Sequence, residues 1–352
     1  MKFTMIVLTA AFVTPLMTSS QDKVAPPNAT LTSAGRPTNL RLKVEARTPF
    51  VGGLAGKSRC DAEGNIYFRP TDSDTAERYH PTSALPVRRI RPDGSLGGSF
   101  SISDTSPGLL ATDFFVTTGG KVYQVARSES SRSVYVVSYS PEGSLESKVR
   151  LETEFFLPYQ VAVFRSGEFL VSGIRGSYNR TPFTAVYGNN GELIREIYEP
   201  EDDDARKRAE AGEPGFRPDN MQSSNDFVTH GDVVLGSDGN AYLLRAASPA
   251  LIYTVSSKGE VVRTLRVDSP TPGLLAAELK SADGLLAIGF LEHGRNTGVI
   301  QVVDFRGNSV ASYAPEDSRM YPGLLACYTP NRLVFVGLAN GDNLRLNIAE
   351  PK

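Results

Sequence analysis

Several features that would assign a chain to a known chemistry are missing from this sequence. It has no tryptophan, three histidines and two cysteines among 352 residues, and neither a GxSxG nor an HExxH motif occurs. A hydrolase nucleophile elbow is therefore absent, and the histidines have no local spacing that would mark a zinc site. Positive charge is not in excess either, since 37 Lys and Arg face 39 Asp and Glu. Without such an excess, a dedicated nucleic-acid binder is not expected.

Glycine, proline and apolar residues, by contrast, are well represented. There are 32 glycines and 23 prolines, together about 16% of the chain, which favours many short elements joined by tight turns. The hydrophobic fraction of 40% suffices for a core and excludes wholesale disorder. The length allows two average domains or one large all-β domain.

The N-terminus has the layout of an export signal. Lys2 precedes an apolar stretch over residues 3–17, and small polar residues follow, so we expect residues 1–20 to be a signal peptide cleaved after Ser20. A transmembrane anchor is the alternative, but about 15 residues interrupted by Pro15 are short for a span that needs about 20. We expect residues 21–38 to be a flexible leader, and the protein to be secreted or periplasmic without a membrane anchor.

A repeated pattern of two tight turns is the most informative feature of the chain. The first turn of each unit has glycine at 64, 120, 167, 239 and 284, and Pro330-Asn331 takes its place in a sixth unit. The second turn has glycine at 94, 143, 191, 259 and 307. Glycine supplies the positive φ that two-residue hairpin turns require. Each unit therefore holds four strands, and four-stranded sheets repeated radially are the blades of a β-propeller.

The count of units predicts an all-β fold: a six-bladed β-propeller of four-stranded blades, in a single domain over residues 39–352. Division by six gives about 52 residues per blade, near the range of propeller repeats. The last unit contains strands over 324–329, 332–338 and 344–349, so the N-terminal segment 39–46 is predicted to complete this blade and close the ring. Five or seven blades or a β-sandwich are the alternatives, but a sandwich would not repeat two phased turns.

Two segments, DAEGNIYF and GSDGNAYLL, resemble the inner hairpin of NHL-type repeats, and the chain as a whole resembles the six-bladed, TolB-like propeller class. The resemblance covers most of residues 39–352. It implies the fold but leaves the function open, because members of the class bind proteins, sugars or lactones. The missing tryptophan separates the chain from propellers with a tryptophan signature, such as WD repeats and quinoprotein dehydrogenases.

The two cysteines occupy equivalent positions in the first and last units. Cys60 lies four residues before Gly64 and Cys327 four before Asn331, both on innermost strands. An exported protein meets an oxidising compartment, so a disulfide that staples the ring closure is permitted. Two buried free thiols are the alternative, because innermost strands of adjacent blades are usually too far apart for the Cα separation of about 4.4–6.8 Å that a disulfide needs.

Candidate ligand-binding residues are predicted on one face of the disc. The first and last hairpins of each unit are tight, so every long connection falls on the same face. Arginines, all three histidines and two tyrosines lie in these connections: Arg69, Arg127, Arg175, Arg180, Arg245, Arg295, His80, His230, His293, Tyr79 and Tyr178. Guanidinium groups beside aromatic rings suit an anionic ligand such as a carboxylate-bearing sugar or an acidic peptide. Alternatively, these arginines are simply exposed or pair with nearby acids.

Metal sites and other motifs have less support. The three histidines could meet at a zinc ion, and Asp113, Asn225, Asp226 and Asp232 could hold a divalent ion, although the motifs of six-bladed lactonases are not matched. The tripeptide Gly56-Lys57-Ser58 is similar to part of a phosphate loop, but Val51 replaces its first glycine. The insertion 199–232 carries acids before bases, as in a short solvated helix, and lacks the ligand spacing of a calcium loop.

These observations predict a monomeric binding scaffold that acts through its long-loop face on a protein partner or an acidic carbohydrate or peptide. No cofactor is predicted for this scaffold. One alternative is a metal-dependent hydrolase or lactonase with a divalent ion in the central channel. Another is a lyase in which an arginine neutralises the carboxylate of an acidic sugar and a histidine moves a proton. Acids or histidines that converge at the channel mouth would favour an enzyme, and arginines spread along the rim would favour a binding module.

Overall fold

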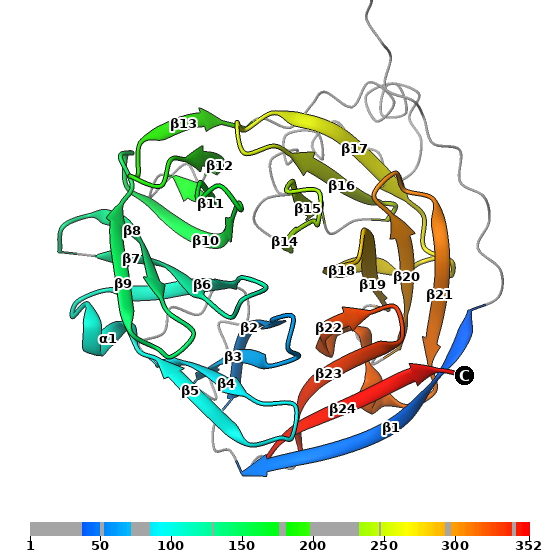
Figure 1. Cartoon of the computed structure of the whole chain (residues 1–352). Helices are drawn as coiled ribbons and strands as arrows, with labels where there is room; N and C mark the ends of the chain where they lie inside the picture. The colour runs from blue at the N-terminus through cyan, green and yellow to red at the C-terminus, as the bar shows by residue number, and fades with distance from the viewer. Residues whose placement is uncertain are drawn as a thin grey trace, which may run out of the picture.

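The computed structural model describes residues 37–49, 53–71, 85–128, 130–175, 181–197, 232–245, 248–292, 297–339 and 343–352. They form an all-β fold of the propeller class, with sheets arranged radially around a centre (Figure 1). Helix within these residues is limited to α1 (Ile102–Thr105) and the 3-10 segments η2 (Ser318–Met320) and η3 (Pro322–Leu324). The described chain therefore consists almost entirely of strands and turns.

Four of the sheets hold four strands each, and neighbours in the chain are hydrogen-bonded neighbours in space. The first sheet is β2 (Gly53–Cys60), β3 (Ile66–Thr71), β4 (Val87–Ile90) and β5 (Leu96–Phe100). The second is β6 (Leu110–Val116), β7 (Val122–Ser128), β8 (Ser133–Tyr139) and β9 (Leu145–Arg150). The third is β10 (Phe156–Val163), β11 (Phe169–Arg175), β12 (Thr181–Tyr187) and β13 (Leu193–Glu196). The fourth is β14 (Val233–Leu235), β15 (Ala241–Arg245), β16 (Ala250–Val255) and β17 (Val261–Val267).

A fifth sheet has eight strands instead of four. It contains β18 (Leu275–Ala282), β19 (Leu285–Leu291), β20 (Gly298–Asp304), β21 (Ser309–Pro315), β1 (Thr38–Pro49), β24 (Asn343–Pro351), β23 (Arg332–Ala339) and β22 (Leu325–Thr329), in that spatial order. The predicted segment 39–46 lies in β1, which pairs antiparallel with β24. Five sheets are present instead of six separate ones, because β1 also pairs in parallel with β21 and so joins two groups of four strands. Thr38 to Leu40 face Tyr313 to Pro315 in this pairing.

The turns agree with the sequence pattern. All ten predicted turn glycines have positive φ, from 75° at Gly259 to 104° at Gly167. At Gly191 the requirement is strict, because a Cβ atom there would overlap the carbonyl oxygen of Arg150. The prediction of phased tight turns is confirmed at these positions.

Apolar side chains fill the space between neighbouring sheets. Val125 of β7 and Val161 of β10 are fully buried in one cluster, and Leu244 of β15 and Ile288 of β19 in another. Complete burial of one such side chain contributes about 1.5–3 kcal/mol. The core is therefore repeated around the disc, and each sheet is held by the next.

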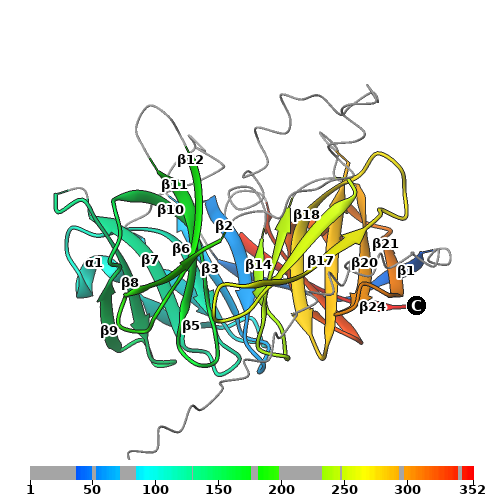
Figure 2. The ribbon, with the colours of Figure 1, turned by 90° about the horizontal axis from the view of Figure 1, so that it is seen from above.

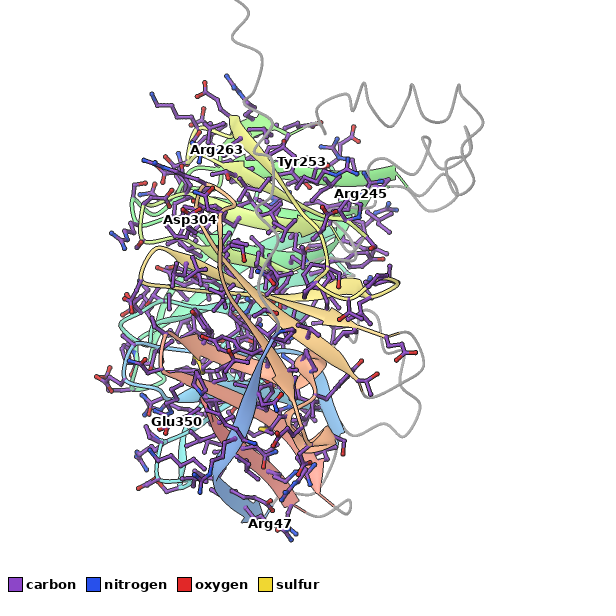
Figure 3. All side chains as sticks on the ribbon, turned by 90° about the vertical axis from the view of Figure 1, so that its right-hand side faces the viewer. Arg47, Arg245, Tyr253, Arg263, Asp304 and Glu350 are labelled. Carbon is purple, nitrogen blue, oxygen red and sulfur yellow. A yellow bond between two sulfur atoms is a disulfide. The ribbon has the colours of Figure 1, made fainter. Side chains whose placement is uncertain are left out.

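The two faces of the disc carry different connections. Figure 2 shows the strands crossing the thickness of the disc. Figure 3 shows the disc from its edge. Arg245, at the end of β15, and Asp304, at the start of a tight turn, lie toward opposite faces of the disc. We call β2, β6, β10, β14, β18 and β22 the inner strands, because they surround the centre in Figure 1. The inner strands begin at the long-loop end of the centre and finish at its tight-turn end.

Several predicted segments lie outside the described residues. They are the signal peptide 1–20, the leader 21–38 except for its last two residues, and the insertion 199–232 except for Asp232. The signal peptide, the leader and the insertion helix stay predictions. Among the residues that are described, no helix is long and apolar enough to cross a membrane.

Candidate functional site

Bulges in the inner strands bring polar side chains to the centre of the disc. In five inner strands the pairing register shifts at a similar place. The first residues paired after these shifts are Arg59, Asp113, Gln160, Glu278 and Cys327. A bulge inserts an extra residue and re-aims the side chains next to it. The shared irregularity is therefore a reason why charged groups, instead of apolar ones, meet at the centre.

A lysine–carboxylate chain forms one half of the central site. The Nζ atom of Lys57 on β2 lies 2.6 Å from Oε1 of Glu278 on β18 and donates to the carbonyl oxygen of Ala277 at 2.8 Å. The other carboxylate oxygen of Glu278 lies 3.3 Å from Nζ of Lys280, which also lies 3.0 Å from Oδ2 of Asp232. Alternating charges thus join β2 to β18, although Lys57 and Glu278 are 221 residues apart in the sequence.

Arg59 connects this lysine–carboxylate chain to a third carboxylate, that of Asp113. Its Nη2 atom lies 3.3 Å from Oδ2 of Asp113 on β6, and its Nη1 atom lies 3.6 Å from Oδ1 of Asp232. The guanidinium also donates to the carbonyl oxygens of Phe114 at 2.6 Å and Val233 at 3.1 Å. We call Lys57, Arg59, Asp113, Asp232, Glu278 and Lys280 the central charge cluster.

Burial and pairing determine the protonation of the cluster. Burial alone would raise the pKa of Asp232, but Lys280, Arg59 and Lys57 outweigh it and hold that pKa well below its usual value. Burial alone would lower the pKa of Lys57, but Glu278 and Asp232 raise it overall. Asp232 and Lys57 are therefore both charged at neutral pH. Only Lys57 is appreciably exposed, at 28% of its side chain, so it forms the accessible edge of the cluster.

Arg69 is a buried cation beside the cluster. It is 2% exposed, and its Nη2 donates to Oε1 of Gln124 on β7 at 2.9 Å. Its guanidinium lies 5.6 Å from the centroid of the Phe114 ring, and Arg59 lies 6.0 Å from the same centroid. Burial lowers the pKa of Arg69 to about 10, so it stays charged at neutral pH. No described carboxylate forms a salt bridge with it, and its Nε has no hydrogen-bond partner.

The other predicted rim residues have different positions. Arg175 lies 2.7 Å from Glu196 and 3.7 Å from the centroid of the Phe183 ring, both within its own sheet. Arg127 and Arg245 lie at the ends of β7 and β15 and are half-buried. The remaining predicted residues lie outside the described ranges: Arg180, Arg295, His80, His230, His293, Tyr79 and Tyr178. Arg175 fits the alternative of pairing with a nearby acid, whereas Arg69 is buried instead of standing on an exposed rim.

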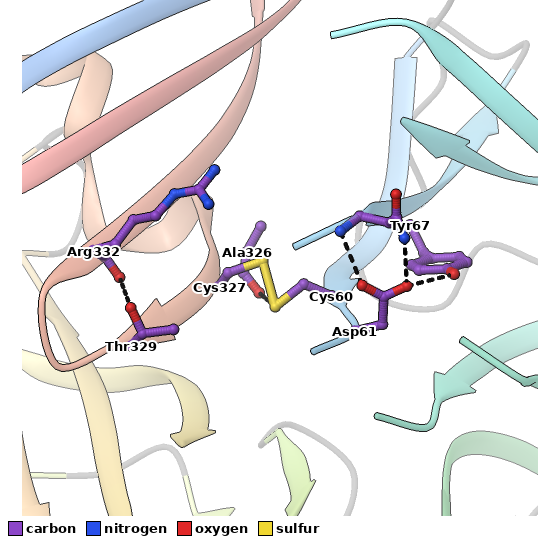
Figure 4. The surroundings of a disulfide bond; sticks show 8 residues. Cys60, Asp61, Tyr67, Ala326, Cys327, Thr329 and Arg332 are labelled. Atoms are coloured by element: carbon purple, nitrogen blue, oxygen red, sulfur yellow. Dashed lines mark hydrogen bonds between the residues drawn. A yellow bond between two sulfur atoms is a disulfide. The ribbon is translucent and has the colours of Figure 1, made fainter. Parts of the chain in front are cut away.

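The two cysteines are joined in a disulfide between β2 and β22 (Figure 4). Their Cα atoms are 5.7 Å apart, within the usual range of about 4.4–6.8 Å. The objection that these innermost strands lie too far apart was therefore wrong: beside the centre of the disc, β2 and β22 approach closely. The bond links segments separated by 267 residues.

Sequence reasoning found only part of the central cluster. Asp113 and Asp232 were proposed as metal ligands, and Lys57 was considered only as part of a failed phosphate loop. Arg59, Glu278 and Lys280 were missed. The available indication was a charged pair inside an otherwise strand-like segment, in AGKSRC and again in AELKSA. Charged residues are almost never fully buried unless they are paired, so two such segments in inner strands predict a shared ion-pair site.

The described carboxylates do not fit a divalent metal. Asp113, Asp232 and Glu278 each contact a lysine or arginine, so a metal ion among them would meet three neighbouring cations. No group of three or more His, Cys, Asp or Glu side chains in the described ranges is arranged to hold a metal. The predicted ligands Asn225 and Asp226 lie outside these ranges.

Comparisons with known proteins support the class of fold. No family model and no curated protein matches the sequence, so the NHL-type and TolB-like resemblance stays a prediction. A protein of unknown function from Dyadobacter fermentans is similar in structure, with a TM-score of 0.52 and 11% identity over 89% of this chain and 100% of that one. Because the identity is so low, this likeness shows the fold alone, and it agrees with a β-propeller.

Two further solved structures have lower scores. A gluconolactonase from Xanthomonas campestris has a TM-score of 0.49 and 13% identity over 90% of this chain and 98% of that one. Regucalcin from Agrobacterium tumefaciens, described as calcium-binding, has a TM-score of 0.45 and 11% identity over 87% and 93% of the two chains. Neither likeness carries an argument about this site.

Proposed function

We propose that this protein binds a small carboxylate-bearing ligand, such as an acidic sugar, at the long-loop end of its centre. The observation that supports this proposal is an excess of positive charge. The central charge cluster and the adjacent Arg69 contain four cationic and three anionic side chains, so one positive charge has no carboxylate partner within the described part of the chain. A buried uncompensated charge is costly, and a bound carboxylate would remove that cost.

Lys57 is the group best placed to meet such a ligand. It is the most exposed member of the cluster, and it lies near the middle of β2, on the long-loop side of Arg59. Glu278 keeps a second partner in Lys280, so Lys57 can turn one of its N–H groups to a ligand without leaving that carboxylate unpaired. Arg69 supplies a further, buried positive charge beside the Phe114 ring.

Replacement of Lys57 by methionine is expected to weaken carboxylate binding by at least tenfold, because a hydrogen bond to a charged group contributes about 1.5–3 kcal/mol. Calorimetric titration with galacturonate and gluconate measures the change. Lys43→Met is the matched control: Lys43 also pairs with a glutamate at 2.6 Å, but on the outer strand β1. If Lys57→Met and the unchanged protein bind these acids equally well, or neither binds them, the proposed site is wrong.

Hydrolysis of a lactone is the second candidate, and the Lys57–Glu278 pair favours it. The buried carboxylate of Glu278, which lies beside the accessible ammonium of Lys57, could take a proton from water, whose oxygen then adds to the lactone carbonyl carbon. The adjacent ammonium would stabilise the negative oxygen that forms. The ring C–O bond then breaks and its oxygen is protonated, which leaves a hydroxy acid. This product belongs to the same carboxylate class as the proposed ligand.

Rates with gluconolactone test this candidate. If the pair acts as described, hydrolysis above the spontaneous rate falls to that rate in Glu278→Gln and is unaffected by EDTA. Hydrolysis that EDTA abolishes would instead support the predicted metal-dependent lactonase. No hydrolysis above background would exclude gluconolactone as a substrate and leave carboxylate binding as the proposal.

We also infer that the eight-stranded sheet counts as two blades, which makes six in all and closes the ring through β1. The antiparallel pairing of β1 with β24 supports this inference, because β1 then occupies the place of a fourth strand beside β22, β23 and β24. Export to the periplasm or the medium stays part of the proposal, and the disulfide is compatible with an oxidising compartment.

A further inference from the structure

A cavity of about 760 Å³ opens at the tight-turn end of the centre, beyond the central charge cluster. Its lining comes from the final residues of the inner strands and the turns that follow them. Aromatic side chains contribute much of the wall, namely Phe115, Phe164, Tyr123 and Tyr328. The volume lies within the range of about 300–1,000 Å³ that small-molecule pockets occupy.

The floor of this cavity is cationic. Arg59 and Lys280 belong to its lining, whereas the three carboxylates with which they pair, Asp113, Asp232 and Glu278, do not. The side chains of Arg59 and Lys280 are only 8% and 7% exposed, so water screens their charge weakly. A molecule in the cavity would meet the positive ends of these ion pairs before their negative partners.

Part of the wall is held in place covalently. Cys60 and Cys327 line it, and their disulfide joins β2 to β22 (Figure 4). Leu235 at the end of β14 and Val116 at the end of β6 add aliphatic surface. The cavity therefore combines a cationic base with aromatic and aliphatic surface, and charged side chains also belong to its lining: Asp61, Glu63, Arg165, Asp283 and Arg332.

From this arrangement we infer a second ligand site, which binds an amphipathic monocarboxylate such as a medium-chain fatty acid or an arylalkanoic acid. The carboxylate would accept from Lys280 and Arg59 at the floor, and the apolar body would lie against the aromatic wall. The Nζ atom of Lys280 lies 3.0 Å from Asp232 and 3.3 Å from Glu278, so the third N–H of its ammonium group can donate to a ligand carboxylate.

This inference does not depend on the proposed function. The proposed carboxylate site uses Lys57 and Arg69 at the long-loop end, and the second site uses the opposite faces of Arg59 and Lys280. Either site can fail while the other holds. The central charge cluster would then separate two ligands on one axis.

A single introduced tryptophan can report on the cavity, because the chain has none of its own. Leu235→Trp places the reporter in the lining, and Leu275→Trp is the matched control. Leu275 is 44% exposed at the start of β18, whereas the cavity is lined by residues at the other end of that strand. We expect octanoate to change the fluorescence of Leu235→Trp saturably and to leave that of Leu275→Trp unchanged.

Calorimetric titration of the unmodified protein with octanoate provides a second measurement that does not depend on any substitution. We expect octanoate to bind saturably at one site and 1-octanol to bind at least tenfold more weakly. Galacturonate should not displace bound octanoate. Absence of saturable octanoate binding in both measurements would overturn the inference. Equal affinity for octanoate and 1-octanol would overturn the role of the cationic floor.

Discussion

Removal of the disulfide is expected to lower the free energy of unfolding by about 4 kcal/mol. The bond between Cys60 and Cys327 closes a loop of 267 residues, and it joins the first and fifth sheets beside the centre of the disc. A cross-link that closes so long a loop lowers the conformational entropy of the unfolded chain. Removal of a native disulfide typically costs about 2–5 kcal/mol of stability. The variant is Cys60→Ala with Cys327→Ala, and urea unfolding followed by circular dichroism measures the loss.

Reduction distinguishes the effect of the S–S bond on stability from the effect of replacing the two side chains. Dithiothreitol should lower the urea midpoint of the unmodified protein and leave that of the double alanine variant unchanged. If dithiothreitol does not change the urea midpoint of the unmodified protein, the two thiols are not bonded in solution. That result would also favour the alternative of two buried free thiols.

Neutralisation of Asp232 is expected to destabilise the protein by about 3–5 kcal/mol, because it leaves Lys280 and Arg59 without their shared carboxylate. Asp232→Asn preserves the size of the side chain and removes only its charge. Combination with Lys280→Met should recover part of the loss, since one uncompensated cation is then gone. Thermal unfolding of the two single variants and the double variant gives the coupling between the residues. Equal and additive losses would contradict the ion-pair description.

The same residue predicts a pH dependence of defined sign. The folded-state pKa of Asp232 is held below its usual value, so its contribution to stability is complete above the unfolded-state pKa of about 3.9. The contribution is lost as the pH falls below that value toward the folded-state pKa. The difference in stability between the unmodified protein and Asp232→Asn should therefore be constant from pH 7 to about 5 and shrink below about 4.

The repeat could be predicted from the sequence because it rests on local chemistry. The glycines at 64 and 94 and their eight counterparts are required by the turn geometry itself, whatever surrounds them. The spacing of these glycines predicts four strands in each unit. The alternating pattern of residues 39–46 predicts a further strand without a partner of its own. The merging of two sheets through β1 and β21 could not be predicted in this way, because it depends on three parallel pairs between segments more than 270 residues apart.

The candidate site was harder to predict because its residues are distant in sequence. Lys57 and Glu278 are 221 residues apart, and neither belongs to a local motif. The arginines at strand ends were easier to notice, since at least one occurs in each of five units. Arg175, however, pairs with Glu196 of its own sheet, and Arg69 is buried against Phe114. Recurrence at equivalent positions thus located strand ends and did not by itself define a common binding surface.

By itself, the sequence determined the all-β class, the phased turns and the equivalence of Cys60 and Cys327, because each depends on residues close together or on a repeated spacing. Only the tertiary structure decided which polar side chains meet. Bulges in the inner strands, and the radial arrangement that brings β2 beside both β6 and β22, place Arg59 against Asp113 and Cys60 against Cys327. A buried charge is stabilised by whatever the fold places within a few ångströms of it, and that distance is not encoded in any single segment.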